Sequence, residues 1–295
     1  MGLLRFTGAD AEGFLQGQVS NDAGRLRAHE PLLAAYSTAQ GRVIALLRLL
    51  PHSGGVVGVL PRELVAPTLE RMRKFVLRAQ VAIEDATEHY AVAGQHDSKA
   101  LSAAGLRVPQ AAEGYAEQDG IGVARVSAGA TRCWVIGPEA ALARRALAGE
   151  EAAAERIDHD WRLADIRAGM PQVYAATSEL FVAQMLNLDL LDGISFTKGC
   201  YTGQEIIART QHLGRIKRRM FRLRLPPGSY AIGQALELAD GRSGRLTELA
   251  AVGESFEALA VLGKAGAAET EAASSAAVAA TPLPLPYSTA ASTRQ

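Results

Sequence analysis

The hydrophobic pattern of the first 150 residues predicts short strands that alternate with single helices. Two apolar segments joined by Ala39, Gln40 and Gly41 are typical of a β-hairpin whose turn contains glycine. Between residues 62 and 78, apolar side chains recur every three or four positions with basic residues between them, which predicts an amphipathic helix. Because no regular βαβ repeat is present, the pattern indicates an α+β fold. The other predicted helices are 10–18 and 138–148, and the predicted strands are 3–7, 31–38, 42–50, 54–60, 81–85 and 90–94.

The pattern changes from about Met220 onward. Short apolar segments separated by Pro-Pro-Gly and Asp-Gly turns predict a small all-β barrel or sandwich. Residues 264–281 are rich in Ala, Ser and Glu and lack large side chains to bury, so we expect a flexible insert. The apolar island 283–288 that follows fits either a disordered tail or a segment that docks on the fold. The predicted strands of this region are 221–225, 235–238, 244–252 and 257–262.

Composition and charge narrow the classes of function. The 31 basic side chains balance the 31 acidic ones, which argues against a protein that coats nucleic acid by bulk electrostatics. The two cysteines, Cys133 and Cys200, cannot form a disulfide framework. Neither cysteine lies in a CxxC motif, and the six histidines lack metal-ligand spacing, so no metal site is expected.

The chain contains no sequence that predicts membrane association. No apolar run reaches the roughly 18 residues that a spanning helix needs. The N-terminus lacks the charged and apolar regions of a signal peptide. We therefore expect a cytoplasmic protein with reduced thiols and no contact with membranes.

Residues 194–224 contain the most specific local signals. Thr202 and Glu205 form a T-x-x-E pattern, which predicts a capping box at the start of a helix that runs from Gly203 to about His212. Such a box satisfies the first amides of the helix with two side chains.

Cys200 lies two residues before this predicted N-cap. The helix dipole and the nearby Lys198 favour a thiolate there, and Gly199 permits close approach of the backbone. These features point to an activated or cofactor-contacting thiol. The competing interpretation is a small buried side chain at a helix start. Cys133, in the apolar segment TRCWVIG, is interpreted as core packing.

The string KGCYTGQE closely resembles the signature of the YgfZ family of folate-binding proteins, which are related to the aminomethyltransferase (T-protein) of the glycine cleavage system. The resemblance implies a T-protein-like folate-binding fold of two α+β lobes with a small C-terminal β-barrel around a bound tetrahydrofolate. It also implies a role in iron–sulfur cluster assembly or maintenance that indirectly supports tRNA modification. Similar segments are FTGADAEGFLQGQVSND, LLAAYSTAQGRVIALLRLL, GISFTKGCYTGQEIIAR and the ending LPYS.

The resemblance also implies a division of the chain. We expect a folate-binding α+β region of two lobes at 1–219 and a β-barrel formed by 220–263 together with 282–289. Residues 264–281 would be the flexible insert, and 290–295 a short tail.

The family's functional residues are assigned by matching its motif. Cys200 occupies the position at which the family's function is thought to concentrate, so it is the candidate catalytic thiol. Trp161, in DWRLADIRAGMP, matches an aromatic residue associated with folate, and an indole face stacks well on a pterin or aminobenzoyl ring. Ordinary core packing is the alternative for Trp161. The remaining motif residues are Lys198, Gly199, Tyr201, Gly203, Gln204 and Glu205.

Two departures from the family pattern bear on activity. A second folate-associated aromatic would fall at or before Met1, so either the start is shortened or that contact is missing. The acidic pair that aminomethyltransferases carry in the first hairpin is replaced by Ala45 and Leu46, and neither can act as a general base. Aminomethyl transfer is therefore not expected, although a folate-dependent enzyme of this type is the alternative function. Whether any reaction is catalysed stays open.

The implied partners are folate and, transiently, iron–sulfur cluster proteins. A cluster usually takes four protein ligands, so a single cysteine would need ligands from a partner or a small thiol. The stretch 206–224 holds seven basic and no acidic residues, which could contact tRNA phosphates or a folate glutamate tail. We do not expect tRNA contact through Arg209–Arg224, because the chain is neutral and poor in aromatic residues.

Overall fold

The computed structural model groups the chain into two compact units, each discontinuous in sequence. Unit 1 comprises Met1–Tyr36, Ala45–Asp158 and Thr197–Thr202, and unit 2 comprises Ser37–Ile44, His159–Phe196 and Gly203–Gln295. The residues that the structure describes are 1–52, 54–96, 98–111, 114–126, 132–145, 151–212, 216–263 and 277–289, with the backbone alone at 151–157 and 212.

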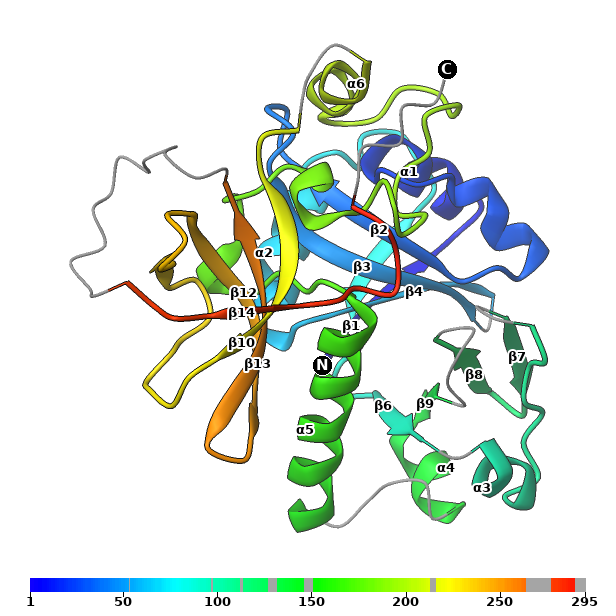
Figure 1. The fold of residues 1–295 in the computed structure, drawn as a ribbon. Coiled ribbons are helices and arrows are strands. Elements are labelled where there is room, and N and C mark those ends of the chain that lie inside the picture. The colour runs from blue at the N-terminus through cyan, green and yellow to red at the C-terminus, as the bar shows by residue number, and fades with distance from the viewer. Residues whose placement is uncertain are drawn as a thin grey trace. The chain divides into compact units, whose positions relative to one another are not determined.

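The first sheet confirms the strands predicted for the N-terminal region, and its β3–β4, β4–β1 and β1–β5 pairs are antiparallel. Its order is β2 (Leu32–Ser37), β3 (Val43–His52), β4 (Gly55–Leu60), β1 (Gly2–Thr7) and β5 (Ala82–Asp85) (Figure 1). Every residue of β3 is buried, as expected for a strand covered on both faces. The accompanying helices are α1 (Ala11–Gln18), η1 (Ala23–Ala28), η2 (Arg62–Leu64) and α2 (Val65–Arg73).

The helix predicted at 62–78 is wrong at its C-terminal end, because α2 stops at Arg73. The amides of Lys74, Phe75 and Val76 each bond to a carbonyl three residues earlier, so the backbone tightens into turns. The chain must reverse direction within the segment 74–81 to enter β5 beside β1. This topological requirement overrides the helical periodicity of the sequence.

A second sheet of unit 1 has the order β6 (Tyr90–Gln95), β9 (Cys133–Pro138), β8 (Ile121–Arg125) and β7 (Tyr115–Gln118). Its core includes Leu101 of α3 (Ser98–Ala103), Leu142 of α4 (Glu139–Arg144) and Cys133, all fully buried. Cys133 therefore packs in the core, as its apolar surroundings predicted. The helix predicted at 138–148 begins as expected, but α4 ends at Arg144, and 146–148 lie outside the described residues.

Unit 2 contains the C-terminal part of α5 (Glu151–Ala168), a helix that the hydrophobic pattern did not reveal. Its sheet has the order β11 (Ala235–Glu237), β12 (Ser243–Val252), β13 (Ser255–Leu262), β10 (Arg219–Leu225) and β14 (Thr281–Leu283). Leucines from four of these strands form its core, and the four predicted strands are confirmed. The remaining elements are η3 (Ala175–Thr177), η4 (Ala183–Leu186) and α6 (Gln204–His212).

This sheet is open, which corrects the expectation of a closed β-barrel. The edge strands β11 and β14 have three residues each and do not pair as a ladder in the described part of the chain. A single parallel bridge, between Leu238 and Val278, links the residues that follow β11 to those that precede β14. Strands this short supply too few hydrogen bonds to close the sheet. Residues 264–276 of the expected insert and 290–295 of the expected tail lie outside the described residues.

The apolar island at 283–288 docks within unit 2. The hydroxyl of Tyr287 donates a 2.6 Å hydrogen bond to the carbonyl of Gly169, directly after α5. A Cβ atom on Gly169 would lie 2.6 Å from both Leu285 Cδ2 and Tyr287 Oη, so the segment sits closely on this glycine. Of the two interpretations left open by the sequence, docking is therefore the one observed.

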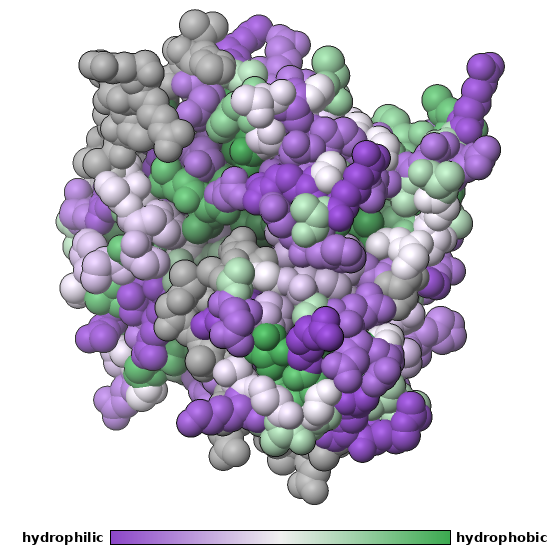
Figure 2. Space-filling model, turned by 90° about the vertical axis from the view of Figure 1, so that its right-hand side faces the viewer, coloured by the Kyte–Doolittle hydropathy of each residue, from purple (hydrophilic) through white to green (hydrophobic). Residues whose placement is uncertain are grey.

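The surface is consistent with the burial of the apolar strands. Hydrophilic side chains occupy much of the face shown in Figure 2, with smaller hydrophobic areas between them. Among the described residues, no helix is long and apolar enough to span a membrane.

His52 connects the two sheets of unit 1. Its imidazole is almost fully buried at the end of β3, and Nδ1 lies 2.7 Å from the hydroxyl of Tyr115 and 3.4 Å from the carboxylate of Glu117. The ring meets Tyr90 edge-on, with 5.5 Å between centroids. Within the described structure, Nε2 has no hydrogen-bond partner. Burial lowers the pKa of His52, although Glu117 opposes this effect.

This burial predicts loss of stability in acid. An unfolded chain protonates His52 near pH 6.5, whereas the folded chain resists protonation until a lower pH, so unfolding becomes more favourable as the pH falls below 6.5. We expect the free energy of unfolding, measured with urea, to fall between about pH 7.5 and about pH 5.5. The fall should be smaller in His52→Phe, and equal pH dependence in the two proteins would exclude this role.

Candidate functional site

The segment 197–202 is anchored to the chain that follows α1, within unit 1. The ammonium of Lys198 donates 2.8 Å hydrogen bonds to the backbone carbonyls of Val19 and Asn21. The same ammonium lies 4.8 Å from the centroid of the Tyr201 ring, close enough for a cation–π contact. Burial lowers the pKa of Lys198 to about 8, although Asp22 acts in the opposite direction. Lys198 therefore ties two distant parts of the sequence together.

Anchors on both sides leave Cys200 at the surface. Tyr201 is buried, and burial raises its pKa to about 12. The amide of Thr202 donates a 3.3 Å hydrogen bond to the carbonyl of Gly17. Cys200 is an exposed free thiol, unlike the buried Cys133, whose pKa is raised by burial. The interpretation of Cys200 as a small buried residue at a helix start is thus wrong.

The predicted capping box is also wrong. Helix α6 begins at Gln204, so Gly203 and not Thr202 directly precedes it. The amide of Thr202 bonds to Gly17, and the carboxylate of Glu205 pairs with Arg209 one turn along the helix at 2.8 Å. A carboxylate within α6 finds a cation at the i+4 position more readily than it reaches back past a glycine.

Gly203 has a structural reason to be glycine. Its φ is +83°, and a Cβ atom there would lie 2.6 Å from the carbonyl oxygen of Thr38 and 3.1 Å from Cα of Gly41. Gly41 also has a positive φ, +70°, and a Cβ on it would lie 2.9 Å from Cβ of Ile206. The turn of the first hairpin and the start of α6 therefore approach each other through two glycines within unit 2. Gln204 begins the helix at this contact.

Trp161 lies in the C-terminal part of α5, which belongs to unit 2, and its side chain is half-buried. The adjacent Arg162 lies 3.6 Å from Glu248, a buried carboxyl on β12 that accepts a 2.7 Å hydrogen bond from the hydroxyl of Tyr174. Burial raises the pKa of Glu248 to about 7, even though Tyr174 and Arg162 both act to lower it. The sequence offered no signal for this pair, because Tyr174 and Glu248 are 74 residues apart.

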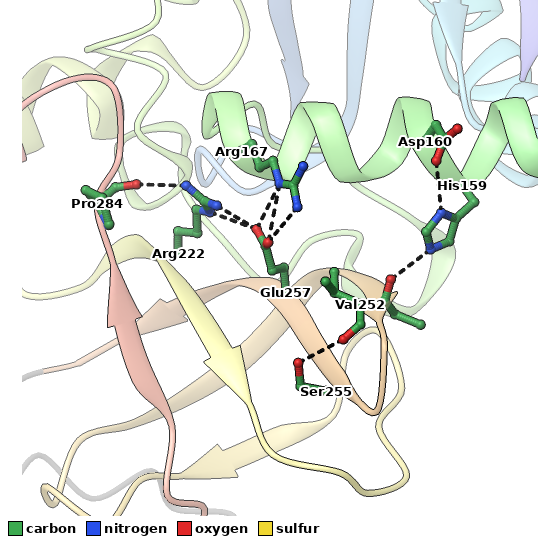
Figure 3. A network of polar contacts seen from close by, with 9 residues as sticks. His159, Asp160, Arg167, Arg222, Val252, Ser255, Glu257 and Pro284 are labelled. Atoms are coloured by element: carbon green, nitrogen blue, oxygen red, sulfur yellow. Dashed lines mark hydrogen bonds and ion pairs between the residues drawn. The ribbon is translucent and has the colours of Figure 1, made fainter.

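A second buried carboxylate links α5 to the same sheet. Glu257 of β13 receives hydrogen bonds from Arg167 of α5 and Arg222 of β10, the shortest being 2.9 and 2.6 Å (Figure 3). Burial alone would raise the pKa of Glu257, but the two arginines outweigh it and hold the pKa below its usual value. Nearby, Nε2 of His159 lies 2.9 Å from the carbonyl oxygen of Ala251.

Carboxylates pair with three arginines of the basic stretch 206–224, and two of these carboxylates come from other segments. Arg219 forms a bidentate pair with Asp189 at 2.8 and 2.9 Å, Arg222 pairs with Glu257, and Arg209 pairs with Glu205. Arg215 lies outside the described residues. Three of the seven cations that the sequence displays as a run therefore serve in ion pairs.

Ala45 and Leu46, which replace the acidic pair, are fully buried in β3 and present no polar group. Among the described residues, no group of three or more His, Cys, Asp or Glu side chains could hold a metal ion.

The chain is similar to proteins of the same name from several bacteria. No protein-family model matches the chain. It is 34% identical over 254 residues to the tRNA-modifying protein YgfZ of Shigella sonnei, across 83% of this chain and 76% of that protein. The corresponding protein of Yersinia pestis is 33% identical over 254 residues, with coverage of 83% and 75%. That of Hamiltonella defensa is 30% identical over 247 residues, with coverage of 80% and 72%.

A solved structure supports the fold. The crystal structure of glycine cleavage system aminomethyltransferase T from Bartonella henselae matches with a TM-score of 0.64. The match covers 89% of this chain and 76% of that chain at 14% sequence identity. At this identity the likeness establishes a shared α+β fold.

The two glycines of the motif should respond differently to substitution. Gly203→Ala should lower the free energy of unfolding by roughly 1–3 kcal/mol, because its Cβ would meet backbone atoms at a positive φ. Gly199→Ala is the matched control, since no atom lies within 4 Å of its added Cβ, and its effect should stay within roughly 0.5 kcal/mol. Chemical denaturation measures the free energy of unfolding of both variants. Equal losses in the two would contradict the structural role assigned to Gly203.

Proposed function

The chain belongs to the YgfZ family, and from this we propose that it binds tetrahydrofolate and supports iron–sulfur clusters on which tRNA-modifying enzymes depend. The observation that carries the proposal is the exposed Cys200 thiol within a segment anchored by Lys198, Tyr201 and Thr202. A free thiol at the surface of a protein in the reducing cytoplasm is available to a second molecule. Relatives named as tRNA-modifying proteins supply the biological setting.

One described side chain, Trp161, suits a folate ring. Trp161 is half-buried, which suits an indole that packs on the protein through one part and stacks on a ligand ring through another. Ion pairs of Arg162 with Glu248 and of Arg167 with Glu257 join its helix, α5, to the sheet of unit 2. The backbone that bears the indole is therefore fixed to this sheet. When bound, tetrahydrofolate would supply a carrier for a one-carbon unit. Trp161 would hold and orient its ring system.

Cys200 acts in this proposal as one thiol ligand or nucleophile toward a cluster or sulfur species of another protein. A cluster takes four protein ligands in most sites, and the described residues of this chain contain no cluster of metal-ligating side chains. The remaining ligands therefore come from the partner. Contact with the iron–sulfur protein is transient, and Lys198 and Tyr201 serve as positioning residues for the thiol.

Aminomethyl transfer is not proposed, despite the likeness in fold to an aminomethyltransferase. The positions of the acidic pair hold Ala45 and Leu46, whose buried side chains can neither accept a proton nor bind an ammonium group. Direct tRNA binding through Arg209–Arg224 is not proposed either. Arg209, Arg219 and Arg222 already pair with carboxylates, which leaves fewer cations for phosphates.

Folate binding can be followed by fluorescence, because the chain has two tryptophans. Tetrahydrofolate should quench the emission of the full chain, and Trp161→Ala should abolish the saturable quenching. Trp134→Phe is the control, because Trp134 is buried in β9 and packs under Arg48. Saturable quenching that survives in Trp161→Ala, or is lost in Trp134→Phe alone, would contradict the assignment.

The thiol can be tested separately from the fold. Cys200→Ser should leave the melting temperature nearly unchanged, since the side chain is exposed, but should abolish complementation of a strain that lacks its own YgfZ protein. The readout is the activity of a cluster-dependent tRNA-thiomethylating enzyme. Cys133→Ala should lower stability and retain complementation. Full complementation by Cys200→Ser would overturn the role of this thiol.

A further inference from the structure

The turn that follows α2 exposes two large apolar side chains on unit 1. Leu77 is 85% exposed and Phe75 is 48% exposed, and only Val76 separates them. These two residues belong to the segment where the predicted helix fails to continue. We call residues 74–80 the apolar turn. Adjoining exposed apolar side chains with polar residues around them are a mark of interaction sites.

The apolar turn is held in place by hydrogen bonds at both ends. The amides of Phe75 and Leu77 donate to the carbonyls of Met72 and Phe75, each at 3.0 Å. At the other end, the amide of Gln80 donates a 2.7 Å hydrogen bond to the carboxylate of Asp10. The exposed side chains are therefore presented on an ordered backbone. A preorganised surface loses less conformational entropy when it binds a partner.

Basic residues flank these two side chains in the sequence. Between residues 70 and 80 the chain carries Arg71, Arg73, Lys74 and Arg78 but a single acid, Glu70. Glu70 pairs with Lys74 at 3.1 Å, and the guanidinium of Arg73 also donates a 3.0 Å hydrogen bond to the carbonyl of Ile83. An aromatic and an aliphatic side chain in a segment with an excess of basic residues are complementary to an apolar pocket bordered by carboxylates.

We propose that the apolar turn is a docking surface for a protein partner with an apolar pocket and an acidic rim. This inference rests on the proposed function, which makes the partner an iron–sulfur enzyme that modifies tRNA. A protein fits better than the two other anionic surfaces. Nucleic acid would stack on Phe75 and pair with the arginines but would leave the more exposed Leu77 without a role. A membrane would gain little from two apolar side chains alone.

The test uses the full-length chain and a purified tRNA-thiomethylating enzyme that carries its iron–sulfur clusters. Leu77→Asp should weaken binding by at least about tenfold, as expected for a central apolar anchor. Arg78→Glu should weaken binding by a smaller factor, and raising the salt from about 50 to about 300 mM should weaken the binding of the unmodified chain. The matched control is Leu180→Asp, because Leu180 is also an exposed leucine but lies outside the apolar turn. Leu77→Asp and Arg78→Glu should keep the melting temperature of the unmodified chain, and Leu180→Asp, at a leucine that is 36% exposed, is compared at a temperature at which it is folded.

Bulk tRNA and vesicles of phosphatidylglycerol serve as competing probes. The proposal would be overturned if Leu77→Asp bound the enzyme as tightly as the unmodified chain does. Loss of binding to tRNA or to vesicles in this variant, with enzyme binding unchanged, would assign the apolar turn to that other surface. Failure of the unmodified chain to bind the enzyme would overturn it as well. The proposed function is judged by other readouts, namely Trp161 quenching and Cys200→Ser complementation. If those succeed while Leu77 proves dispensable, the docking surface alone is wrong.

Discussion

The burial of one ammonium group determines how the candidate thiol is presented. Taking the charge of Lys198 out of water is unfavourable, as its lowered pKa reflects, and the carbonyls of Val19 and Asn21 together with the Tyr201 ring offset this cost. These partners fix Lys198 to a point 179 residues earlier in the chain. Cys200 is then held between Lys198 and the buried Tyr201, so its exposure follows from a rigid backbone.

The sequence predicted the strands well because alternating and continuous apolar patterns are local properties. The closed barrel and the capping box are wrong, and the carboxylate partners of the basic run are not predictable from the sequence, since each depends on distant segments. Asp189 and Glu257, which neutralise Arg219 and Arg222, lie 30 and 35 residues away in the chain. The hydrophobic pattern does not reveal helix α5, because the contacts of this helix with the sheet of unit 2 include ion pairs of Arg162 and Arg167. Charged side chains do not contribute to an apolar periodicity.

For the candidate site, sequence motifs located the residues but not their roles. The sequence predicts that Lys198 favours a thiolate at Cys200, and the structure adds that its ammonium binds two backbone carbonyls and an aromatic ring. Gly203 was expected only as a motif position, and the structure explains it by contact with Gly41 and Thr38. Such reasons are invisible to pattern analysis, because they require knowledge of which segments approach each other. In the proposed function, Cys200 is therefore the chemically active residue of the motif, and Lys198 and Gly203 hold the backbone around it.

The proposed function requires that Cys200 is an accessible thiol that acts through its chemistry and not through its packing. The most direct measurement is alkylation of the native protein with iodoacetamide, followed by mass spectrometry and by a reconstituted assay of cluster-dependent tRNA thiomethylation. We predict rapid modification of Cys200, protection of the buried Cys133, an unchanged melting temperature and loss of activity in the assay. Complete modification of Cys200 with activity fully retained would contradict the central claim.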